Sequence, residues 1–278
     1  MDQPLFPDRW NISDPMLIAE TFSSRIWKVR LDGGIAVVKS LKPFDDVEDE
    51  LRGAHLIKWR RGEGLVKLLG LDGQQMLLEY AGERMLVDDL NEHGDAAATE
   101  IAAEVIARLH SPSRHPPPPD LQPLAERFQS LFRKAKADRD AGENSLYVEA
   151  AEIAQRLLAD PDDVRPLHGD VHHENILHGP RGWLSIDPKG VLGDPGFDAA
   201  NLFYNPLDRD DLCLAPERIA SMAAVLARTL GQDVRAILDH AIAYGCLSAA
   251  WHWGDSNRKD ETRELAVAAA IRGVRLSS

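Results

Sequence analysis

The stretch that decides the fold is HGDVHHENILHGPRGWLSID, which runs from His168 to Asp187. Asp170 and Asn175 lie five positions apart in it, and Asp187 follows a short apolar run. Two such runs flank the turn sequence GPRG, a pattern that predicts a β-hairpin. The hairpin would fold Asp187 back toward Asn175, so that three polar side chains meet at its base.

These three residues suit phosphoryl transfer to a hydroxyl group. That reaction needs an aspartate to orient the hydroxyl and accept its proton, and an amide oxygen and a second carboxylate to hold Mg²⁺ on the nucleotide phosphates. Protein kinases space the same groups as HRD, asparagine five residues later and aspartate after a short hairpin. We therefore predict that Asp170 is the catalytic base and that Asn175 and Asp187 are ligands of Mg²⁺.

The composition indicates a soluble globular protein with one large domain or two lobes. The chain has 278 residues, of which 44% are hydrophobic and 28% are charged. Its apolar runs are too short to cross a bilayer, and its start, MDQPLF, lacks the pattern of a signal peptide. Cys213 and Cys246 are the only cysteines, which favours a reducing cytoplasm over a disulfide framework. We expect a cytoplasmic protein, a monomer, with no membrane partner.

The net charge of −13 argues against nucleic acid as a partner, because phosphate contacts need clustered Lys and Arg. It is compatible with a cationic small-molecule substrate drawn to acidic walls. Solubility alone also explains such a charge.

The first 80 residues predict a small lobe with a five-stranded antiparallel sheet and one helix. An acidic segment, Asp45 to Glu50, leads into the helical pattern, which Gly62 and Gly64 end. Asp32-Gly33 and Asp72-Gly73 indicate hairpin turns. The strand candidates are residues 17–20, 26–31, 35–39, 65–69 and 76–80.

Lys39 ends the third predicted strand. A lysine there can reach the α- and β-phosphates of ATP if a helix carboxylate holds it. Glu50 is the first candidate for that carboxylate and Glu48 the second. Taken alone, Lys39 is an ordinary solvated strand-end lysine, but its place before the HGD…N…D pattern favours the nucleotide role.

Two further segments are candidates for nucleotide contacts. The first turn lacks the glycines that protein kinases place over the phosphates, but Ser23 and Ser24 offer hydroxyl and backbone N–H groups. They also fit an ordinary polar turn. Glu79 and Tyr80 lie where the lobes would join, and backbone groups there could read an adenine edge or form a plain linker.

The second part, residues 81–278, predicts a larger and mainly helical lobe. Asp194-Pro195-Gly196 opens a helix that carries Asp198, Asn201 and Phe203. The other predicted helices span residues 95–110, 121–140, 145–159, 216–230, 234–253 and 260–274. The fold class is therefore α+β, a bilobal arrangement like that of protein kinases.

Three segments resemble the aminoglycoside phosphotransferases: HGDVHHENIL, IDPKGVLGDPGFDAANLFYNP and LLEYAGERML. The chain is more closely similar to the streptomycin 6-kinase branch, which is grouped with hydroxyurea-resistance kinases. FYNP and RDDLCL are the segments that point to this branch. The resemblance runs almost from end to end, beginning near Phe6-Pro7.

The resemblance implies the same roles for Asp170, Asn175, Asp187 and Lys39, and a supporting role for Asp198 under the catalytic loop. It implies transfer of the γ-phosphoryl group of ATP to an antibiotic hydroxyl, in this branch the 6-hydroxyl of streptidine. The chain departs from protein kinases in two ways. Glycine stands between His168 and Asp170, and Pro-Lys-Gly follows Asp187 where Phe-Gly is usual. Both suit small-molecule kinases, which need no activation-loop switch.

Streptidine carries guanidinium groups, which carboxylates bind through charge-assisted hydrogen bonds and aromatic rings through cation–π contacts. Each candidate residue also fits a solvated loop or a core position, so we expect only some of them to touch the substrate. The candidates are Asp208, Asp210, Asp211, Glu174, Trp251 and Asp255, with Trp253 beside them.

Two other functions fit parts of the sequence. His168, Asp170, His172 and His173 form a dense cluster that resembles a metal-hydrolase site, but that reading leaves Asn175, Asp187 and Lys39 unexplained. The kinase reading explains them and makes His168 a structural imidazole. A silent kinase-like binding module would have lost a core position, and none is lost. The alternative acceptor is another small hydroxylated or amino compound, such as hydroxyurea or a related aminocyclitol.

Overall fold

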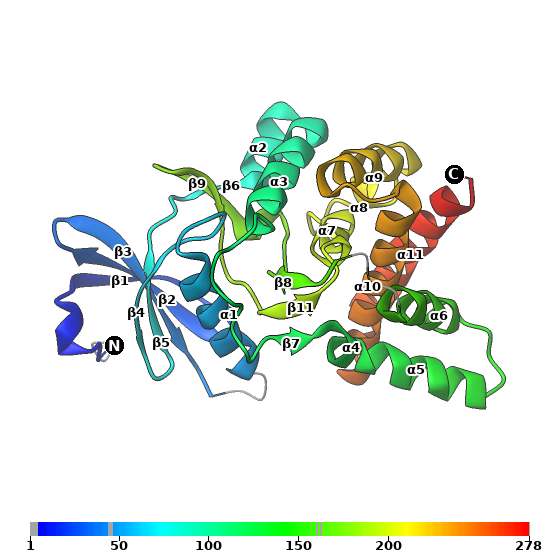
Figure 1. Cartoon of the computed structure of the whole chain (residues 1–278), viewed down its shortest axis with the longest axis horizontal. Coiled ribbons are helices and arrows are strands. Elements are labelled where there is room, and N and C mark those ends of the chain that lie inside the picture. Colours follow the sequence, from blue (N-terminus) through cyan, green and yellow to red (C-terminus); the bar gives the residue numbers. More distant parts are fainter. Residues whose placement is uncertain (1–4, 44–46, 160, 162, 278) are drawn as a thin grey trace.

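The small lobe is built on a single antiparallel sheet, as the sequence predicts. The computed structural model describes residues 5–43, 47–159, 161 and 163–277 (Figure 1). Residues 44–46, at the start of the predicted acidic segment, lie outside the described residues. The sheet has the order β1-β2-β3-β5-β4. Its strands are β1 (Ser13–Glu20), β2 (Ser24–Leu31), β3 (Gly34–Leu41), β4 (Leu68–Asp72) and β5 (Gln75–Glu79).

The two faces of this sheet are covered differently. Ala36 and Val38 alternate along β3 and pack with Trp10, which follows from the two-residue period of a strand. Trp10 ends the short helix η1 (Asp8–Trp10). Helix α1 (Val47–Arg60) buries Ala54 and Ile57 in the main core, to which Leu41, Met76 and Leu78 also belong.

The second hairpin of the sheet begins later than predicted. Residues 65–69 were expected as a strand, but β4 begins at Leu68. The residues before it pair with the large lobe instead. Val66 N–H donates to the carbonyl of Ser185 over 3.1 Å, and Ser185 N–H donates to the carbonyl of Gly64 over 2.8 Å. These bonds connect the two lobes.

The predicted catalytic hairpin is confirmed. β9 (Ile176–Gly179) and β10 (Gly182–Ser185) pair antiparallel, and β6 (Arg84–Met85) adds a third strand. A second small sheet joins β7 (Gln122–Pro123), β11 (Val191–Gly193) and β8 (Arg165–Leu167) in the order β7-β11-β8. The catalytic loop runs from the end of β8 to the start of β9 and includes the short helix η2 (His173–Asn175).

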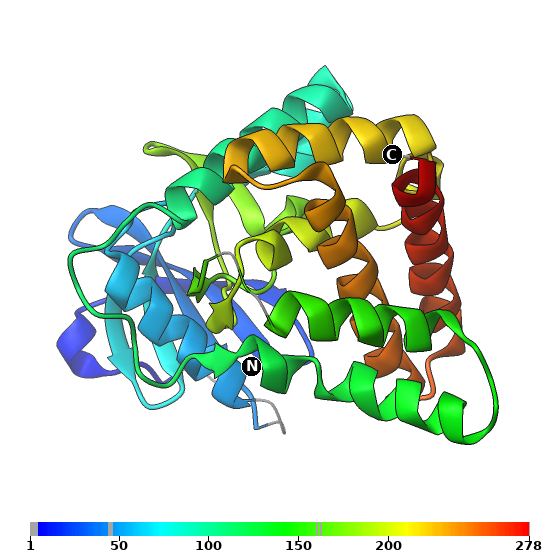
Figure 2. The ribbon, with the colours of Figure 1, turned by 45° about the vertical axis from the view of Figure 1, so that its right-hand side comes forward.

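Helices form the rest of the large lobe. α10 lies at the centre, packed against α6, α7 and α11, and is buried along most of its length (Figures 1 and 2). The helices are α2 (Leu86–His93), α3 (Asp95–Leu109), α4 (Leu124–Arg127), α5 (Gln129–Asp140), α6 (Leu146–Ala159), α7 (Gly196–Ala200), η3 (Asn201–Tyr204), α8 (Asp210–Cys213), α9 (Pro216–Leu230), α10 (Val234–Gly254) and α11 (Arg258–Ser277).

Two details of this lobe differ from the sequence expectation. The single helix predicted over residues 121–140 is divided into β7, α4 and α5, because Gln122 N–H pairs with the carbonyl of Gly190 on a different segment. Helix α2 was not predicted. In the part of the chain that the structure describes, there is no helix of the length and apolarity that a membrane span requires.

Candidate active site

Asp198 on α7 holds the catalytic loop. Its buried carboxylate accepts hydrogen bonds from the backbone N–H groups of His168 (2.9 Å) and Gly169 (2.7 Å), and His110 Nε2 lies 2.9 Å away. Burial by itself raises the pKa of Asp198, but the interaction with His110 outweighs it and the pKa lies below its usual value. Gly169 has φ +84°, and a Cβ there would lie 2.7 Å from Val191 Cγ2, so this position requires glycine.

His168 connects the loop to the hairpin. Its Nε2 lies 2.9 Å from the carbonyl oxygen of Ile186 and 2.7 Å from Ser185 Oγ, while Nδ1 lies 3.2 Å from the backbone N–H of Asp170. Because a carbonyl can only accept, Nε2 carries the hydrogen and Nδ1 accepts. Burial lowers the pKa of His168, so the ring is a neutral brace.

Asp170 is oriented by two amides. Asn201 Nδ2 donates to Asp170 Oδ1 over 3.0 Å, and Asn175 Nδ2 donates to Oδ2 over 3.3 Å and to the Asp170 carbonyl over 3.0 Å. The Asp170 side chain remains 28% exposed. The carboxylate is thus fixed in direction and open to a second molecule. Asn201 was predicted to lie on a helix, without a role in the site. Its position three residues after Asp198, one helical turn on, was the available signal.

Asn175 and Asp187 line the same cavity between the lobes. Asn175 uses its amide nitrogen on Asp170, so its oxygen remains for another partner. The Ile186 N–H bond to the Asn175 carbonyl, 2.9 Å, draws the end of the hairpin beside Asn175. An amide oxygen and a carboxylate are the hard oxygen donors that Mg²⁺ prefers, so this pair fits that ion.

Lys39 meets two carboxylates, those of Glu50 on α1 and Asp187 after the hairpin. Glu50 is the carboxylate that the sequence analysis placed first. Lys189 joins the same group, with Nζ 2.9 Å from Glu50 Oε1 and 3.4 Å from Asp187 Oδ2. Burial alone would raise the pKa of Asp187, but the charges of Lys189 and Lys39 hold it well below its usual range. A role for Lys189 was not predicted from the sequence, where it stands out only as part of the Pro-Lys-Gly that replaces Phe-Gly.

A cavity of about 600 Å³ lies beside this group, between β1–β3 and the hairpin. The apolar side chains of Ile26, Val37, Leu78 and Ile186 contribute to its walls, as suits a flat heterocycle. The residues that line it include seven of the eight that the sequence predicts to contact the nucleotide or its metal ion: Ser23, Ser24, Lys39, Glu79, Tyr80, Asn175 and Asp187. The eighth, Glu50, does not line the cavity.

The side chains at the edge of this cavity are already occupied. Glu79 accepts from Arg181 at both carboxylate oxygens, each over 2.6 Å, and its backbone N–H donates to the Lys67 carbonyl over 2.9 Å. The Tyr80 hydroxyl donates to Glu83 over 2.9 Å. In the turn after β1, Ser24 N–H donates to Thr21 Oγ1 over 3.0 Å. Ser24 therefore closes its own turn.

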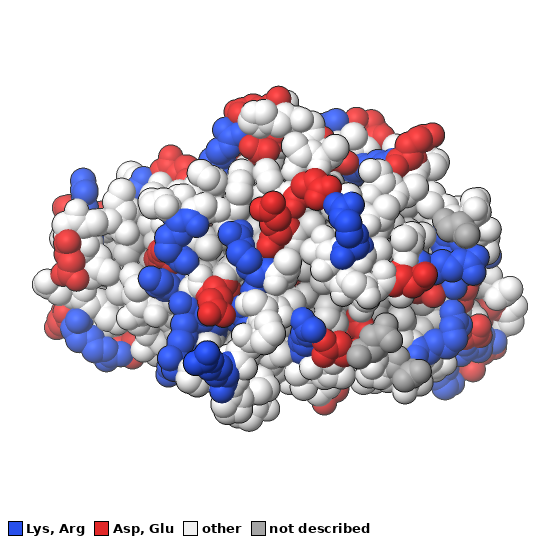
Figure 3. Space-filling view, turned by 45° about the horizontal axis from the view of Figure 1, so that its top comes forward, with Lys and Arg blue, Asp and Glu red and all other residues white. Residues whose placement is uncertain are grey.

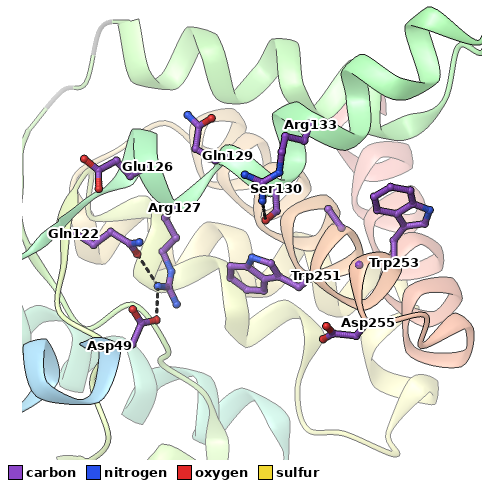
Figure 4. Close-up of a pocket in the computed structure, with 12 residues that line it drawn as sticks. Asp49, Gln122, Glu126, Arg127, Gln129, Ser130, Arg133, Trp251, Trp253 and Asp255 are labelled. Carbon is purple, nitrogen blue, oxygen red and sulfur yellow. Dashed lines mark hydrogen bonds and ion pairs between the residues drawn. The ribbon is translucent and has the colours of Figure 1, made fainter. Parts of the chain in front are cut away.

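A second cavity, of about 750 Å³, lies between α1 and helices α5 and α10 of the large lobe (Figure 4). Trp251 and Asp255, predicted substrate contacts, line it with Trp253. Arg127 crosses it, with Nη1 3.2 Å from Asp49 Oδ2 on α1 and its guanidinium 5.3 Å from the centre of the Trp251 ring. Arg127 and Asp49 were not predicted as site residues, because they lie in separate segments with no shared motif.

The remaining predicted substrate residues lie elsewhere. Among the described residues that line these two cavities, Asp208, Asp210, Asp211 and Glu174 do not appear. Asp210 pairs with Arg263 and Asp211 with Arg209, at 2.8 and 2.9 Å. On the face shown in Figure 3, acidic and basic side chains are interspersed, with no large acidic wall.

The histidine cluster does not assemble as a metal-hydrolase site. His172 Nδ1 lies 2.8 Å from Glu174 Oε2, whereas His173 is fully buried and its ring nitrogens have no hydrogen-bond partner among the described residues. Burial lowers the pKa of His173 to about 3. No group of three or more His, Cys, Asp or Glu side chains in the described ranges is placed to hold a metal ion. The hydrolase alternative is therefore set aside.

Comparison with known proteins agrees with this geometry. Residues 9–256 match the family of aminoglycoside/hydroxyurea antibiotic resistance kinases. The chain belongs to this family. The family resemblance read from the sequence is thus confirmed, and with it a phosphotransferase class for this enzyme.

Two relatives in this kinase family are streptomycin kinases. A streptomycin 3''-kinase of Klebsiella pneumoniae is 38% identical over 273 residues, which cover 95% of this chain and 98% of the relative. A streptomycin 6-kinase of Streptomyces glaucescens is 29% identical over 283 residues, covering 96% and 87%. The two relatives are thus named for phosphorylation at different positions of one antibiotic.

A solved structure confirms the kinase-like fold. A thermostable mutant of an aminoglycoside phosphotransferase, in ternary complex with AMP-PNP and hygromycin B, superposes with a TM-score of 0.63. It is 16% identical, and the match covers 94% of each chain. The predicted α+β bilobal class is therefore correct.

Proposed function

We propose that this kinase transfers the γ-phosphoryl group of ATP to a hydroxyl of streptomycin and so inactivates the antibiotic. The observation that carries the reaction class is the direct Lys39–Asp187 contact beside Asn175 and the oriented Asp170. Lys39 and both candidate Mg²⁺ ligands line the cavity between the lobes, and the candidate base Asp170 lies 3.3 Å from the Asn175 amide nitrogen.

Each of these side chains has a task in the transfer. Lys39, held by Glu50, binds the nucleotide phosphates. Asp170 accepts the hydrogen bond of the acceptor hydroxyl and takes its proton as the phosphoryl group moves. Asn201 and Asn175 keep the Asp170 carboxylate in one orientation, which reduces the entropy lost on reaching the transition state.

Asn175 and Asp187 would hold Mg²⁺, which when bound supplies positive charge to the phosphate oxygens. Asp187 has φ 62°, a left-handed conformation that is uncommon for a residue with a side chain. This conformation and the Lys39 contact direct its carboxylate into the cavity.

The second cavity is the proposed acceptor site. Its wall already holds one guanidinium group, that of Arg127, between the Asp49 carboxylate and the Trp251 ring (Figure 4). Ion pairing and stacking of this kind are how a protein recognises guanidinium groups, which streptomycin carries on its streptidine ring. Asp255 and Glu126 add acidic side chains to the same wall.

The position of phosphorylation is a finer proposal. The resemblance seen in the sequence implied the 6-hydroxyl of streptidine. The chain is 38% identical to the 3''-kinase relative and 29% identical to the 6-kinase relative. The match also covers more of the 3''-kinase, 98% of its length against 87% of the 6-kinase. We therefore propose the 3''-hydroxyl first and the 6-hydroxyl second. Two-dimensional ¹H–³¹P NMR of the product identifies the esterified carbon directly.

ATP consumption against a panel tests the acceptor. The panel contains streptomycin, dihydrostreptomycin, kanamycin, spectinomycin, hydroxyurea and choline. We expect turnover confined to the two streptidine-bearing compounds. Turnover on hydroxyurea alone would keep the kinase class but replace the acceptor, and turnover on kanamycin would refute recognition through guanidinium groups.

A further inference from the structure

Two lysines and two carboxylates form a closed ring at the junction of the lobes. Glu50 uses one carboxylate oxygen on Lys39 and the other on Lys189, whose Nζ lies 2.9 Å away. Asp187 likewise contacts Lys39 with one oxygen and lies 3.4 Å from Lys189 with the other. The ring has no net charge, and each carboxylate has two cationic partners.

This arrangement differs from the protein-kinase pattern, in which one lysine pairs with the helix carboxylate. If Lys39 turns toward nucleotide phosphates, it must leave Asp187 and share its charge between Glu50 and the phosphates. Glu50 is only 5% exposed, so water cannot replace the lost interaction. A buried carboxylate whose partner is withdrawn is strongly destabilising.

The main chain fixes Lys189 between α1 and the catalytic loop. Its backbone N–H donates to the His168 carbonyl over 2.7 Å. On one side of it, a Cβ at Gly53 of α1 would lie 1.8 Å from the Pro188 carbonyl oxygen. On the other side, a Cβ at Gly190 would lie 2.9 Å from the Arg52 backbone. The segment that carries Lys189 thus packs directly on the backbone of α1.

We propose that Lys189 is a positioning residue that keeps Glu50, and with it helix α1, docked on the catalytic loop while Lys39 serves the nucleotide. In protein kinases the same helix is a mobile control element. Here Lys189, a second cation whose backbone is anchored, holds helix α1 in place whether or not Lys39 contacts Glu50. The inference rests on the proposed nucleotide binding, but one arm of its test does not.

Hydrogen exchange of α1, residues 47–60, tests the role of Lys189 directly. Wild type, Lys189→Met, Lys189→Arg and Lys136→Met are compared without nucleotide and with AMP-PNP and MgCl₂. Lys136→Met is the matched control, since it removes a lysine that pairs with Asp140 over 2.5 Å on the exposed face of α5. Wild type and this control should show equal or slower α1 exchange with nucleotide.

In Lys189→Met, AMP-PNP should speed α1 exchange about tenfold, as expected for loss of a buried hydrogen bond between charged groups. Lys189→Arg should behave as wild type. If Lys189→Met speeds α1 exchange equally with and without AMP-PNP, or leaves it unchanged in both states, Lys189 has no role linked to the nucleotide and the proposal is wrong.

A second variant covers the case in which Lys189→Met does not fold or wild type does not bind AMP-PNP. In Lys39→Met without nucleotide, Lys189 alone must hold Glu50. Exchange of α1 should then stay within about threefold of wild type. Loss of α1 protection in this variant overturns the proposal. Failure of AMP-PNP to bind wild type, with α1 protected in Lys39→Met, would instead count against the proposed kinase function alone.

Discussion

The side-chain amide of Asn201 donates a hydrogen bond to Oδ1 of Asp170 over 3.0 Å. Asn205 Nδ2 in turn donates to Asn201 Oδ1 over 2.9 Å, so the amide that orients the Asp170 carboxylate is itself oriented. Since Asp170 is held from the other side by Asn175, its direction is set by residues both before and after the hairpin.

Removal of this amide should impair turnover more than binding. In Asn201→Ala, Asp170 keeps only the bond from Asn175 and can rotate away from the acceptor hydroxyl. We expect kcat to fall about tenfold to a hundredfold while the KM for ATP changes little. Steady-state kinetics with varied ATP measures both. An increase in KM for ATP with kcat unchanged would show that Asn201 acts on the nucleotide side instead.

Gly53→Ala should reverse the usual effect of replacing a helix glycine. Alanine is ordinarily better by about 1 kcal/mol inside a helix. At Gly53, however, the added Cβ would lie 1.8 Å from the Pro188 carbonyl oxygen, so α1 must shift. We expect a loss of about 2 kcal/mol or more in the free energy of unfolding.

Gly273→Ala on α11 is the matched control for that substitution, because a Cβ there meets nothing within 4 Å. This variant should be as stable as wild type or slightly more stable. Urea unfolding of both variants gives the comparison. Equal stabilisation by the two alanines would contradict the tight packing of α1 on Pro188.

Asp198→Ala should destabilise the chain strongly. The substitution leaves two buried backbone N–H groups, of His168 and Gly169, without their acceptor. We expect the free energy of unfolding to fall by about 3 kcal/mol. Asp211→Ala, which removes an exposed partner of Arg209, should not move the urea midpoint measurably. A mild effect of Asp198→Ala would show that the loop does not depend on this carboxylate.

Glu264 should make stability depend on pH. Burial raises its pKa to about 7, and the nearby Arg263 only partly opposes this. Between pH 4.5 and about pH 7 the folded state therefore binds a proton that the unfolded state has released. The contribution of Glu264 to stability is fully present below pH 4.5 and is lost as pH rises to about 7. Between pH 5 and pH 8 this group should cost about 2 kcal/mol of stability.

Glu264→Gln removes that dependence. Urea unfolding of wild type and variant at pH 5 and pH 8 measures the difference, and other titrating groups cancel in the comparison. An identical pH dependence in the two proteins would show that Glu264 is ionised normally in the folded state.

Trp251→Leu should weaken binding of the acceptor alone. The ring lies under the Arg127 guanidinium, in the cavity proposed for streptomycin. Loss of a stacking surface for a guanidinium should raise the KM for streptomycin about tenfold and leave the KM for ATP unchanged. A change in the ATP value, with that for streptomycin constant, would remove this cavity as the acceptor site.

Local patterns were sufficient to predict the catalytic hairpin and most helices. Asp170, Asn175 and Asp187 fall within one continuous stretch, so their meeting depends only on a hairpin and its turn. Helix α9 (Pro216–Leu230) begins and ends as predicted, since it starts with proline and stops before Gly231. The structure places Lys39 against Glu50, as the order of the small-lobe elements suggested.

Contacts between distant segments could not be predicted in this way. Lys189 and Glu50 are 139 positions apart, and Arg127 and Asp49 are 78 apart. Neither pair belongs to one periodic element, so neither spacing nor hydrophobic pattern signals it. The start of the strand predicted over residues 65–69 was wrong for the same reason, because the backbone there pairs with the distant Ser185 instead of with the sheet. Asp210 looked suitable by charge, but its partner, Arg263, lies 53 positions away in the chain.

The most direct measurement is mass spectrometry of streptomycin after incubation with ATP, Mg²⁺ and either wild type or Asp170→Asn. We expect wild type to add one phosphoryl group to the antibiotic. The Asp170→Asn variant should bind ATP as wild type does but transfer about 10²- to 10⁴-fold more slowly, because it lacks the proton acceptor. Transfer by the variant at the wild-type rate, or unmodified streptomycin after incubation with wild type, would contradict the proposed reaction.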